Sequence, residues 1–183
     1  LTNVFNRLAR SCFYESQNSF GGYMPLGRPS AEVVREAKST LREYERLMHK
    51  VELHSVMQLA DSFIRYAQKY WASGIKEATG QEEAAGIDVA TDGPSELRRQ
   101  VLLDSYYLLR ICTLLMHPIV PTGCETICSY LDFDAAEFFS WSYDFESNDE
   151  LCDAGEITDG QHQVCELPPR FDFFKKHPSQ FKA

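Results

Sequence analysis

Three polar residues near the start of the chain are spaced for recognition chemistry. Asn3, Arg7 and Arg10 are separated by four and three positions, so on a helix they would share one face. An amide and a guanidinium group one turn apart can each make paired hydrogen bonds to a base edge or a nucleic-acid backbone. A polar helix face is more commonly just solvated, so the pattern by itself does not establish a binding site.

A tryptophan is the second candidate for recognition. Trp71 follows Tyr70 at the predicted end of a helix, where an aromatic ring could stack on an unpaired base. The alternative interpretation is that Trp71 belongs to the hydrophobic core, as tryptophan at a helix end usually does.

A third candidate is the segment LLMHPIVPTGCETICSYL, residues 114–131, which combines His117 with Cys124 and Cys128. Structural zinc sites usually take two close pairs of ligands, and this segment offers one pair. The six cysteines are scattered and contain no CxxC motif, so we expect mostly buried, reduced thiols and no metal. Nucleophile-elbow, catalytic-triad and phosphate-loop patterns do not occur either, so we predict no active centre.

The charge of the chain limits its partners. A formal net charge of −9 over 183 residues argues against a general nucleic-acid binder. However, residues 1–50 hold eight Lys and Arg against five Asp and Glu, whereas residues 111–169 hold twelve Asp and Glu and no Lys or Arg. This segregation is compatible with a small, directed contact to an anion.

Neither a membrane nor a secretory route is indicated by the sequence. The apolar stretches are shorter than the roughly 20 residues that span a bilayer, and the first residues lack a secretory-signal pattern. We therefore expect a cytoplasmic protein with no membrane partner.

Hydrophobic periodicity predicts an all-α bundle of about five helices to position these residues. The expected helices cover residues 1–20, 30–49, 53–71, 94–117 and 121–131, with a loop over 80–93. The fourth of these is apolar most of the way round and should occupy the centre of the bundle. His117-Pro118 should end it, and Pro121 should start the short helix that follows.

Beyond Leu131 the sequence becomes aromatic, acidic and aperiodic. The Asp159-Gly160 pair predicts the turn of a small β-hairpin, and residues 167–181 predict an extended docking strip in an irregular C-terminal tail. We divide the chain into a helix bundle over residues 1–131 and a C-terminal extension over residues 132–183.

Three segments together resemble class I aminoacyl-tRNA synthetases of the methionyl branch. LTNVFNRLARSCF is similar to the family's opening helix, in which an Asn and an Arg four residues later precede an apolar run. ADSFIRYAQKYW is similar to a stretch written roughly as ANxYxxxxxPW. LLRICTLLMHPIVPTGCETICSYL resembles the point where the last long helix breaks at (H/K)PxxP. The three occur in the family's order and cover residues 1–131.

This resemblance implies an anticodon-binding helical bundle that recognises the CAU anticodon of tRNA(Met), within a methionine-tRNA ligase that uses ATP. By match to the family's motifs, Asn3 and Arg7 would contact the anticodon and Trp71 would stack on it. We add Arg10, Arg42 and Arg46 as candidates for contact with phosphate.

The sequence departs from the family pattern around Trp71. Tyr70 stands where the family has Pro, Asp61 replaces an Asn, and one extra residue separates Ala60 from Trp71. These changes concern the local geometry of the Trp71 site, and Asp61 adds a negative charge near the expected path of the RNA.

The 183 residues contain no HIGH-like or KMSKS-like motif and no cysteine-rich zinc knob. We therefore expect this chain to be inactive alone, to need no cofactor itself, and to belong to a longer protein whose catalytic domain binds ATP and methionine. The expected partners are tRNA(Met) and that catalytic domain, on which the extension over 132–183 would pack if it does not pack on the bundle.

Two other functions fit the same sequence. One is a helical protein-interaction module that derives from a synthetase and no longer reads RNA, which the net charge and Asp61 favour. The other is the anticodon domain of a different class I synthetase.

Overall fold

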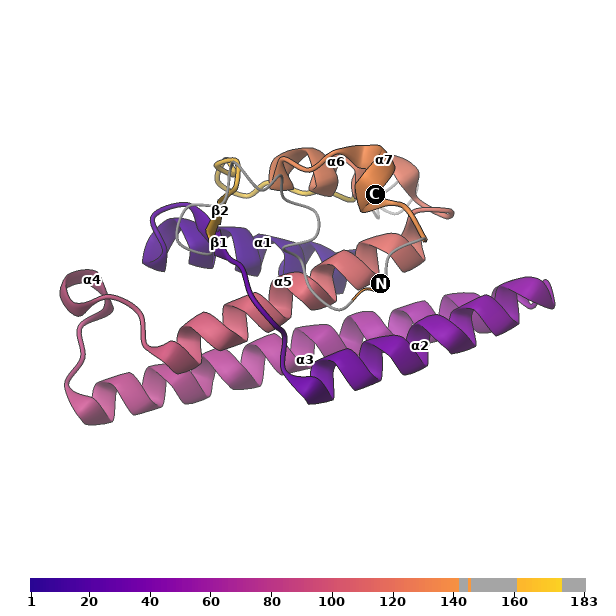
Figure 1. Ribbon diagram of the computed structural model, residues 1–183. Helices are drawn as coiled ribbons and strands as arrows, with labels where there is room; N and C mark the ends of the chain where they lie inside the picture. Colours follow the sequence, from indigo (N-terminus) through magenta and orange to yellow (C-terminus); the bar gives the residue numbers. More distant parts are fainter. Residues whose placement is uncertain (142–144, 146–160, 176–183) are drawn as a thin grey trace, which may run out of the picture.

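The computed structural model describes residues 1–141, 145 and 161–175. This part of the chain is an all-α bundle with one small two-stranded sheet, which confirms the predicted fold class (Figure 1). The elements are α1 (Thr2–Ser19), β1 (Tyr23–Pro25), α2 (Ala31–His49), α3 (Leu53–Ala85), α4 (Val89–Asp92), α5 (Glu96–Met116), α6 (Pro121–Leu131), α7 (Ala135–Phe138) and β2 (Gln161–Gln163).

Helix α5 occupies the centre of the bundle, as its apolar sequence predicts. Every residue from Val101 to Met116 is buried, and the helix contacts α1, α2, α3, α6 and β1. Helices α2 and α3 form a long hairpin on one side of α5, while α1, α6 and α7 cover the other side (Figure 1). In the described residues, no helix is long and apolar enough to cross a bilayer.

The predicted breaks between α2 and α3 and between α5 and α6 are confirmed, as is the predicted start of α5. The break between α2 and α3 falls at residues 50–52, where Val51 adopts a left-handed backbone with φ of 59°. Helix α5 begins after Ser95, whose hydroxyl accepts a hydrogen bond from the backbone amide of Arg98 at 3.2 Å. It ends at Met116 before His117-Pro118, and α6 begins at Pro121.

Helix α3 is longer than the sequence pattern predicts. We expected it to end at Trp71 and a loop to cover residues 80–93, but α3 continues to Ala85 and the short α4 follows. Residues 77–85 are mostly Ala, Glu and Gln, which favour the helix, and one glycine costs only about 1 kcal/mol. Gly86, with φ of 69°, provides the left-handed position that ends the helix.

The tail contributes one strand of a small antiparallel sheet, and this sheet joins distant parts of the chain. Strand β2 pairs antiparallel with β1, with Met24 opposite His162. The amide of Val164 extends the pairing by donating to the carbonyl of Gly22 at 3.0 Å. The predicted turn at Asp159-Gly160 lies outside the described residues.

The strip from Leu167 to Phe174 packs on α1 and α6. The ring of Phe174 stacks on Phe5 with centroids 4.6 Å apart. The side chain of Asn6 donates to the carbonyl of Phe174 at 2.9 Å and accepts from its amide at 3.0 Å. This part of the extension therefore shares the hydrophobic core of the bundle.

Candidate nucleic-acid interface

The outer face of α1 presents the two residues with the strongest claim to recognition. Phe5, Leu8 and Cys12 point into the core, which leaves Asn3 and Arg7 exposed on the opposite side, one turn apart. Among the described residues, Arg7 has no ion-pair partner. Its guanidinium group is therefore available to an anionic ligand.

Arg10 lies on the same face but already has a protein partner. Its guanidinium group is 3.3 Å from the carboxylate of Asp172, in the strip that packs along α1. Both side chains remain partly exposed, so the pair is one that solvent screens and that contributes about 1 kcal/mol or less. A phosphate would have to compete with Asp172 for Arg10.

Trp71 lies in the middle of α3 and not at its end, which corrects the prediction of its position. The side chain is 7% exposed and belongs to the core. Helix α1 runs in the same direction as α3 (Figure 1), and the amino group of Leu1 lies 3.8 Å from the carboxylate of Asp61. Trp71 follows Asp61 by ten residues, which is about 15 Å along α3. A base could stack on the indole only if the ring turned outward.

The charge of Asp61 is matched locally. Arg65, one turn further along α3, donates from Nε to the Asp61 carboxylate at 2.8 Å. This hydrogen bond lowers the pKa of Asp61 below its usual value. The negative charge of Asp61, expected near the path of the RNA, is thus offset by an exposed cation.

Tyr70 has a structural role that the family's proline could not fill. Its hydroxyl donates to the fully buried carboxylate of Asp104 on α5. The same carboxylate accepts from the backbone amide of Ser30 at 2.7 Å, from the hydroxyl of Ser30 at 2.5 Å and from Gln100 at 3.0 Å. Burial and the bond to Asp104 raise the pKa of Tyr70. The network joins the start of α2 to α3 and α5.

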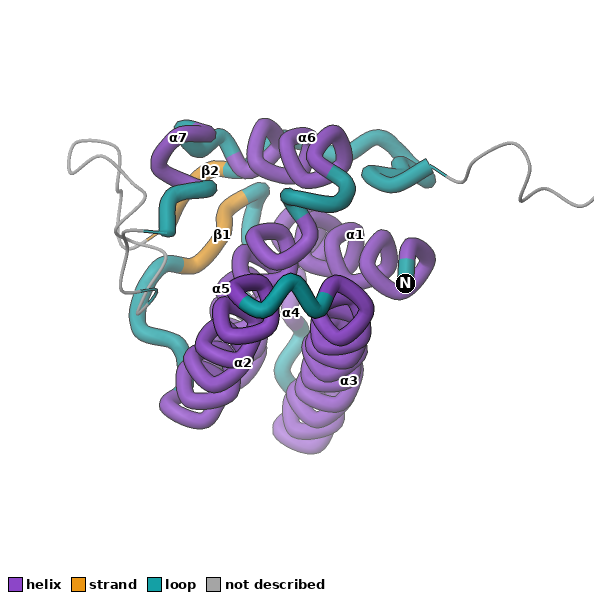
Figure 2. The backbone as a smooth tube through the Cα atoms, turned by 90° about the vertical axis from the view of Figure 1, so that its right-hand side faces the viewer, coloured by secondary structure: helices purple, strands orange, loops and turns teal. Residues whose placement is uncertain are grey.

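Arg42 and Arg46 lie on α2 and are not brought together with the α1 residues. Both side chains are exposed, and Arg46 is paired with Glu43 at 2.5 and 2.7 Å. Helices α1 and α2 each pack mainly against α3 and α5, and the N-terminal end of α1 lies above α3, away from α2 (Figure 2). The predicted phosphate contacts therefore fall on two separate surfaces.

A buried ion network, which the sequence pattern does not predict, joins three helices. Arg98 of α5 binds Glu82 of α3 through Nε at 3.0 Å and Nη2 at 2.6 Å, and binds Glu15 of α1 through Nη1 at 2.6 Å. The hydrogen bonds from Arg98 lower the pKa of Glu82 to about 2. The network sets the positions of α1, α3 and α5, and no local pattern links these three residues in the sequence.

The Cys and His residues near the α5–α6 junction have the properties of packing residues. Cys124 and Cys128 are buried on α6, and burial raises the pKa of Cys124 to about 12 and that of Cys128 to about 11. Both therefore remain thiols at neutral pH and are poor nucleophiles and metal ligands. His117 stacks on Phe139 with centroids 3.8 Å apart. Within the described ranges, no group of three or more Cys, His, Asp and Glu could hold a metal ion.

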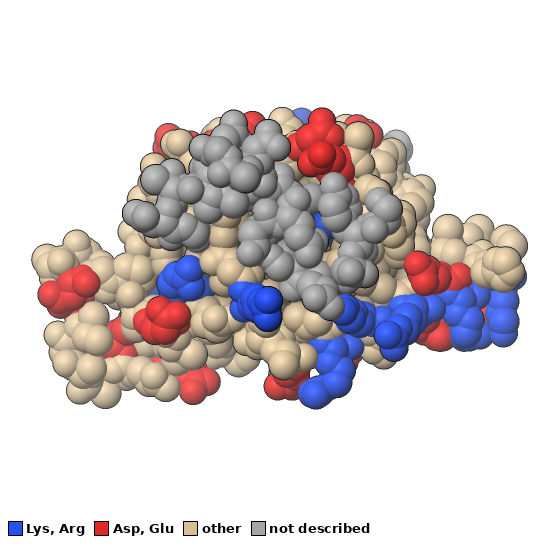
Figure 3. Space-filling view, in the orientation of Figure 1, with Lys and Arg blue, Asp and Glu red and all other residues tan. Residues whose placement is uncertain are grey.

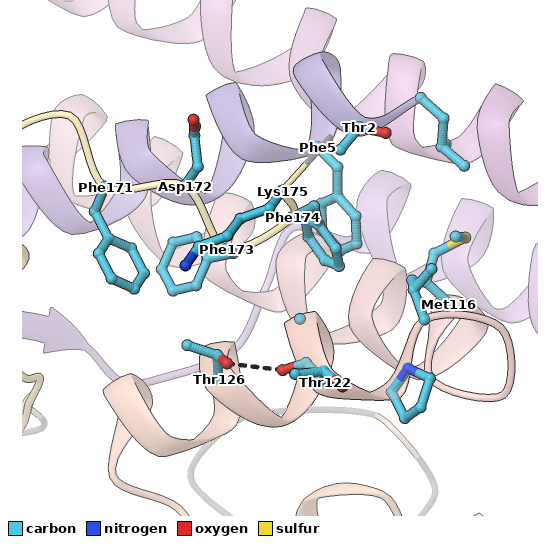
Figure 4. Close-up of a pocket in the computed structure, with 14 residues that line it drawn as sticks. Thr2, Phe5, Met116, Thr122, Thr126, Phe171, Asp172, Phe173, Phe174 and Lys175 are labelled. Carbon is cyan, nitrogen blue, oxygen red and sulfur yellow. Dashed lines mark hydrogen bonds between the residues drawn. The ribbon is translucent and has the colours of Figure 1, made fainter. Parts of the chain in front are cut away.

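A cavity of about 530 Å³ lies between the start of α1, the start of α6 and the tail strip (Figure 4). Its walls are mostly apolar, with Phe5, Met116 and Phe174 among them, and Lys175 and Asp172 lie at its edge. Among the described residues that line it there is no cysteine or histidine and only one carboxylate, so we assign it no reaction.

Comparison with known proteins shows a likeness in structure only. No protein-family model and no curated protein sequence matches the chain. Methionyl-tRNA synthetase from Mycobacterium tuberculosis in its free state is similar, with a TM-score of 0.68 and 17% identity over 97% of this chain. Two structures of that enzyme with methionyl-adenylate give TM-scores of 0.62 and 0.61, at 18% and 17% identity, each over 96% of this chain.

The described fold is therefore similar to that of part of these methionyl-tRNA synthetases. The chain spans about a third of the length of these enzymes, with 33% of the first and 31% of the other two covered. At this level of identity the likeness is one of fold.

Proposed function

We propose that the chain is the anticodon-binding domain of a methionine-tRNA ligase and reads the CAU anticodon of tRNA(Met). The observation that carries the proposal is the exposed Asn3–Arg7 pair on the opening helix of a fold shared with methionyl-tRNA synthetases. The pair combines an amide with a guanidinium group that has no ion-pair partner among the described residues.

In this proposal Asn3 and Arg7 read base edges. Their side chains start about 6 Å apart along the helix, and each can make two parallel hydrogen bonds to one base. Arg10 contacts a neighbouring phosphate in exchange for Asp172. Trp71 stacks on an unpaired base after its ring leaves the core, and the loss of its buried area reduces the net gain from stacking.

The parent protein would be a ligase that attaches methionine to tRNA using ATP. ATP and methionine would bind in its catalytic domain, because the residues described above include no candidate for either. Binding energy at the anticodon would favour placement of the distant acceptor end in that domain. The partners of this chain would be tRNA(Met) and the catalytic domain of the parent protein, in the cytoplasm.

The burial of Trp71 favours a second candidate, a helical protein-interaction module that derives from a synthetase and no longer reads RNA. A ring that is 7% exposed is accounted for by its place in the core, without any role in RNA binding. In that case the Asn3–Arg7 face is an ordinary solvated surface.

The two candidates differ in what the α1 variants do to RNA recognition. The chain is titrated with an RNA hairpin that carries the anticodon loop of methionine tRNA, and with a hairpin whose CAU is changed. Asn3→Ala and Arg7→Gln should each lower the preference for CAU by about tenfold, since a paired contact to one base contributes about 1–3 kcal/mol. Asn18→Ala, an exposed residue near the other end of α1, is the matched control and should leave the preference unchanged. A wild-type chain without any preference would support the interaction module.

A further inference from the structure

Helix α2 carries a row of basic side chains along its outer face. We call Arg35, Lys38, Arg42, Arg46 and Lys50 the α2 ridge. Successive members are three or four residues apart, so they lie on one side of the helix. Figure 3 shows Lys and Arg side chains gathered along α2 on the face turned to the viewer.

The ridge follows from how α2 packs. The side chains on its inner face are buried against α3 and α5, which leaves the opposite face in solvent. The inner-face residues are Val33, Ala37, Leu41, Tyr44 and Leu47. From Arg35 to Lys50 the ridge extends over about 22 Å of helix. It is a straight row of cations on a rigid, well-packed element.

Lys50 and two arginines of the ridge carry charge that no ion pair matches among the described residues. Arg35 and Arg42 are exposed, and neither forms an ion pair with another residue in the described parts of the chain. Arg46 is paired with Glu43, and that exposed pair is easily exchanged for a stronger anion. The acidic residues of α2 lie beside the row, at Glu32, Glu36, Glu43 and Glu45.

The ridge is separate from the Asn3–Arg7 face. Helix α2 lies beside α3, and the N-terminal end of α1 lies above α3 on the side away from α2 (Figure 2). The two surfaces could therefore be occupied independently, and one could be lost without the other.

We propose that the α2 ridge is a second RNA-binding surface, which holds the phosphodiester backbone without reading sequence. An extended backbone presents a regular line of negative charge, and the ridge presents a line of positive charge. Arginine suits phosphate because its planar guanidinium group can bind two oxygens at once. Since the chain as a whole carries a charge of −9, a polyanion would be repelled elsewhere and directed to this row. The proposal does not depend on recognition of CAU.

The test compares two double variants with the same change in net charge. Arg35→Gln/Arg42→Gln removes two unpaired arginines of the ridge, and Lys69→Gln/Lys76→Gln removes two exposed cations of α3. Each variant and the wild-type chain are titrated with labelled oligo-uridylate and with the CAU hairpin at several salt concentrations. Circular dichroism confirms that all variants are folded.

The ridge variant should bind both RNAs about tenfold or more weakly at about 0.1 M salt, because two phosphate contacts are lost. The slope of log affinity against log salt should fall by about 1.5, while the preference for CAU over a changed anticodon stays as in the wild type. Arg35→Lys/Arg42→Lys should restore most of the affinity, because the charges return.

Equal losses in the ridge variant and the α3 control would overturn the proposal, because net charge alone would then account for binding. The proposal would also be overturned if poly-glutamate displaced the labelled RNA as effectively as unlabelled oligo-uridylate does. The ridge would then bind carboxylates and phosphates equally. If the α1 variants lose the preference for CAU while the slope of log affinity against log salt stays as in the wild type, the result bears on the proposed anticodon recognition. It does not change the conclusion about the α2 ridge.

Discussion

Arg98 and Arg7 represent two ways in which this fold uses arginine. Arg98 is 8% exposed and fully engaged, with Glu82, Glu15 and Thr79 all within hydrogen-bonding distance. Arg7 is exposed, and no ion pair links it to the rest of the described chain. The side chain of Arg98 is positioned by its hydrogen bonds to neighbouring helices, whereas the side chain of Arg7 is attached to α1 without such contacts to the described residues. A buried, satisfied cation stabilises one arrangement of helices, and an exposed cation without a partner is free for a ligand.

The contrast predicts that the buried network dominates stability. Glu82→Ala should lower the free energy of unfolding by about 3–5 kcal/mol, because it leaves the buried Arg98 charge incompletely matched. Asp61→Ala, which removes the exposed pair with Arg65, should cost less than about 1 kcal/mol. Urea denaturation of both variants measures the difference. Similar small losses would mean that the network is no stronger than a surface pair.

The same network should respond to acid. The pKa of Glu82 is lowered from 4.5 to about 2 in the folded chain, so its contribution is complete above pH 4.5 and is lost as the pH falls toward 2. That contribution amounts to about 3 kcal/mol. The free energies of unfolding of wild type and Glu82→Gln should therefore converge over this range. A difference that stays constant between pH 5 and about 2 would contradict the assigned role.

The elements of the bundle could be predicted from the sequence because their signals are local. The apolar stripes, Ser95 and the two prolines of the α5–α6 junction each act within a few residues. The Arg98 network could not be predicted, because Glu15, Glu82 and Arg98 come from three helices. The local pattern also underestimated the length of α3, because its last turns are held against α5 by the buried ion pair of Glu82 with Arg98.

On α1, the sequence pattern alone does not predict that Asn6 is buried and Asn3 exposed. Both are asparagines of the opening helix, but Asn6 is 3% exposed and holds the backbone of Phe174, whereas Asn3 faces solvent. The difference depends on a strip 168 residues away, so it appears only in the fold. The same is true of Trp71, whose burial depends on the packing of neighbouring helices.

The packing of the tail strip on α6 should also contribute more to stability than the exposed face of α1 does. A Cβ atom at Gly123 would lie 2.3 Å from the ring of Phe174, so Gly123→Ala should displace the strip and cost about 1–3 kcal/mol. Gly80→Ala meets no atom within 4 Å and should be neutral or stabilise α3 by up to about 1 kcal/mol. Thermal unfolding compares the two. Equal effects would mean that the strip does not pack on α6 as described.

Changes on the exposed face should be the smallest in stability. Asn3→Ala and Arg7→Gln are expected to alter the free energy of unfolding by less than about 0.5 kcal/mol, since neither side chain is buried. The same denaturation experiment gives the values. A loss above about 2 kcal/mol would show that these residues, like Arg98, hold the fold together.

The most direct test of the anticodon proposal is the binding of the wild-type chain to paired RNA hairpins that differ only in the anticodon. One hairpin carries CAU, and each of the others carries one base change at one of the three anticodon positions. Recognition by Asn3 and Arg7 predicts that at least one single change weakens binding by about tenfold or more at constant salt. Equal affinity for every hairpin would contradict the proposal that this chain reads the anticodon.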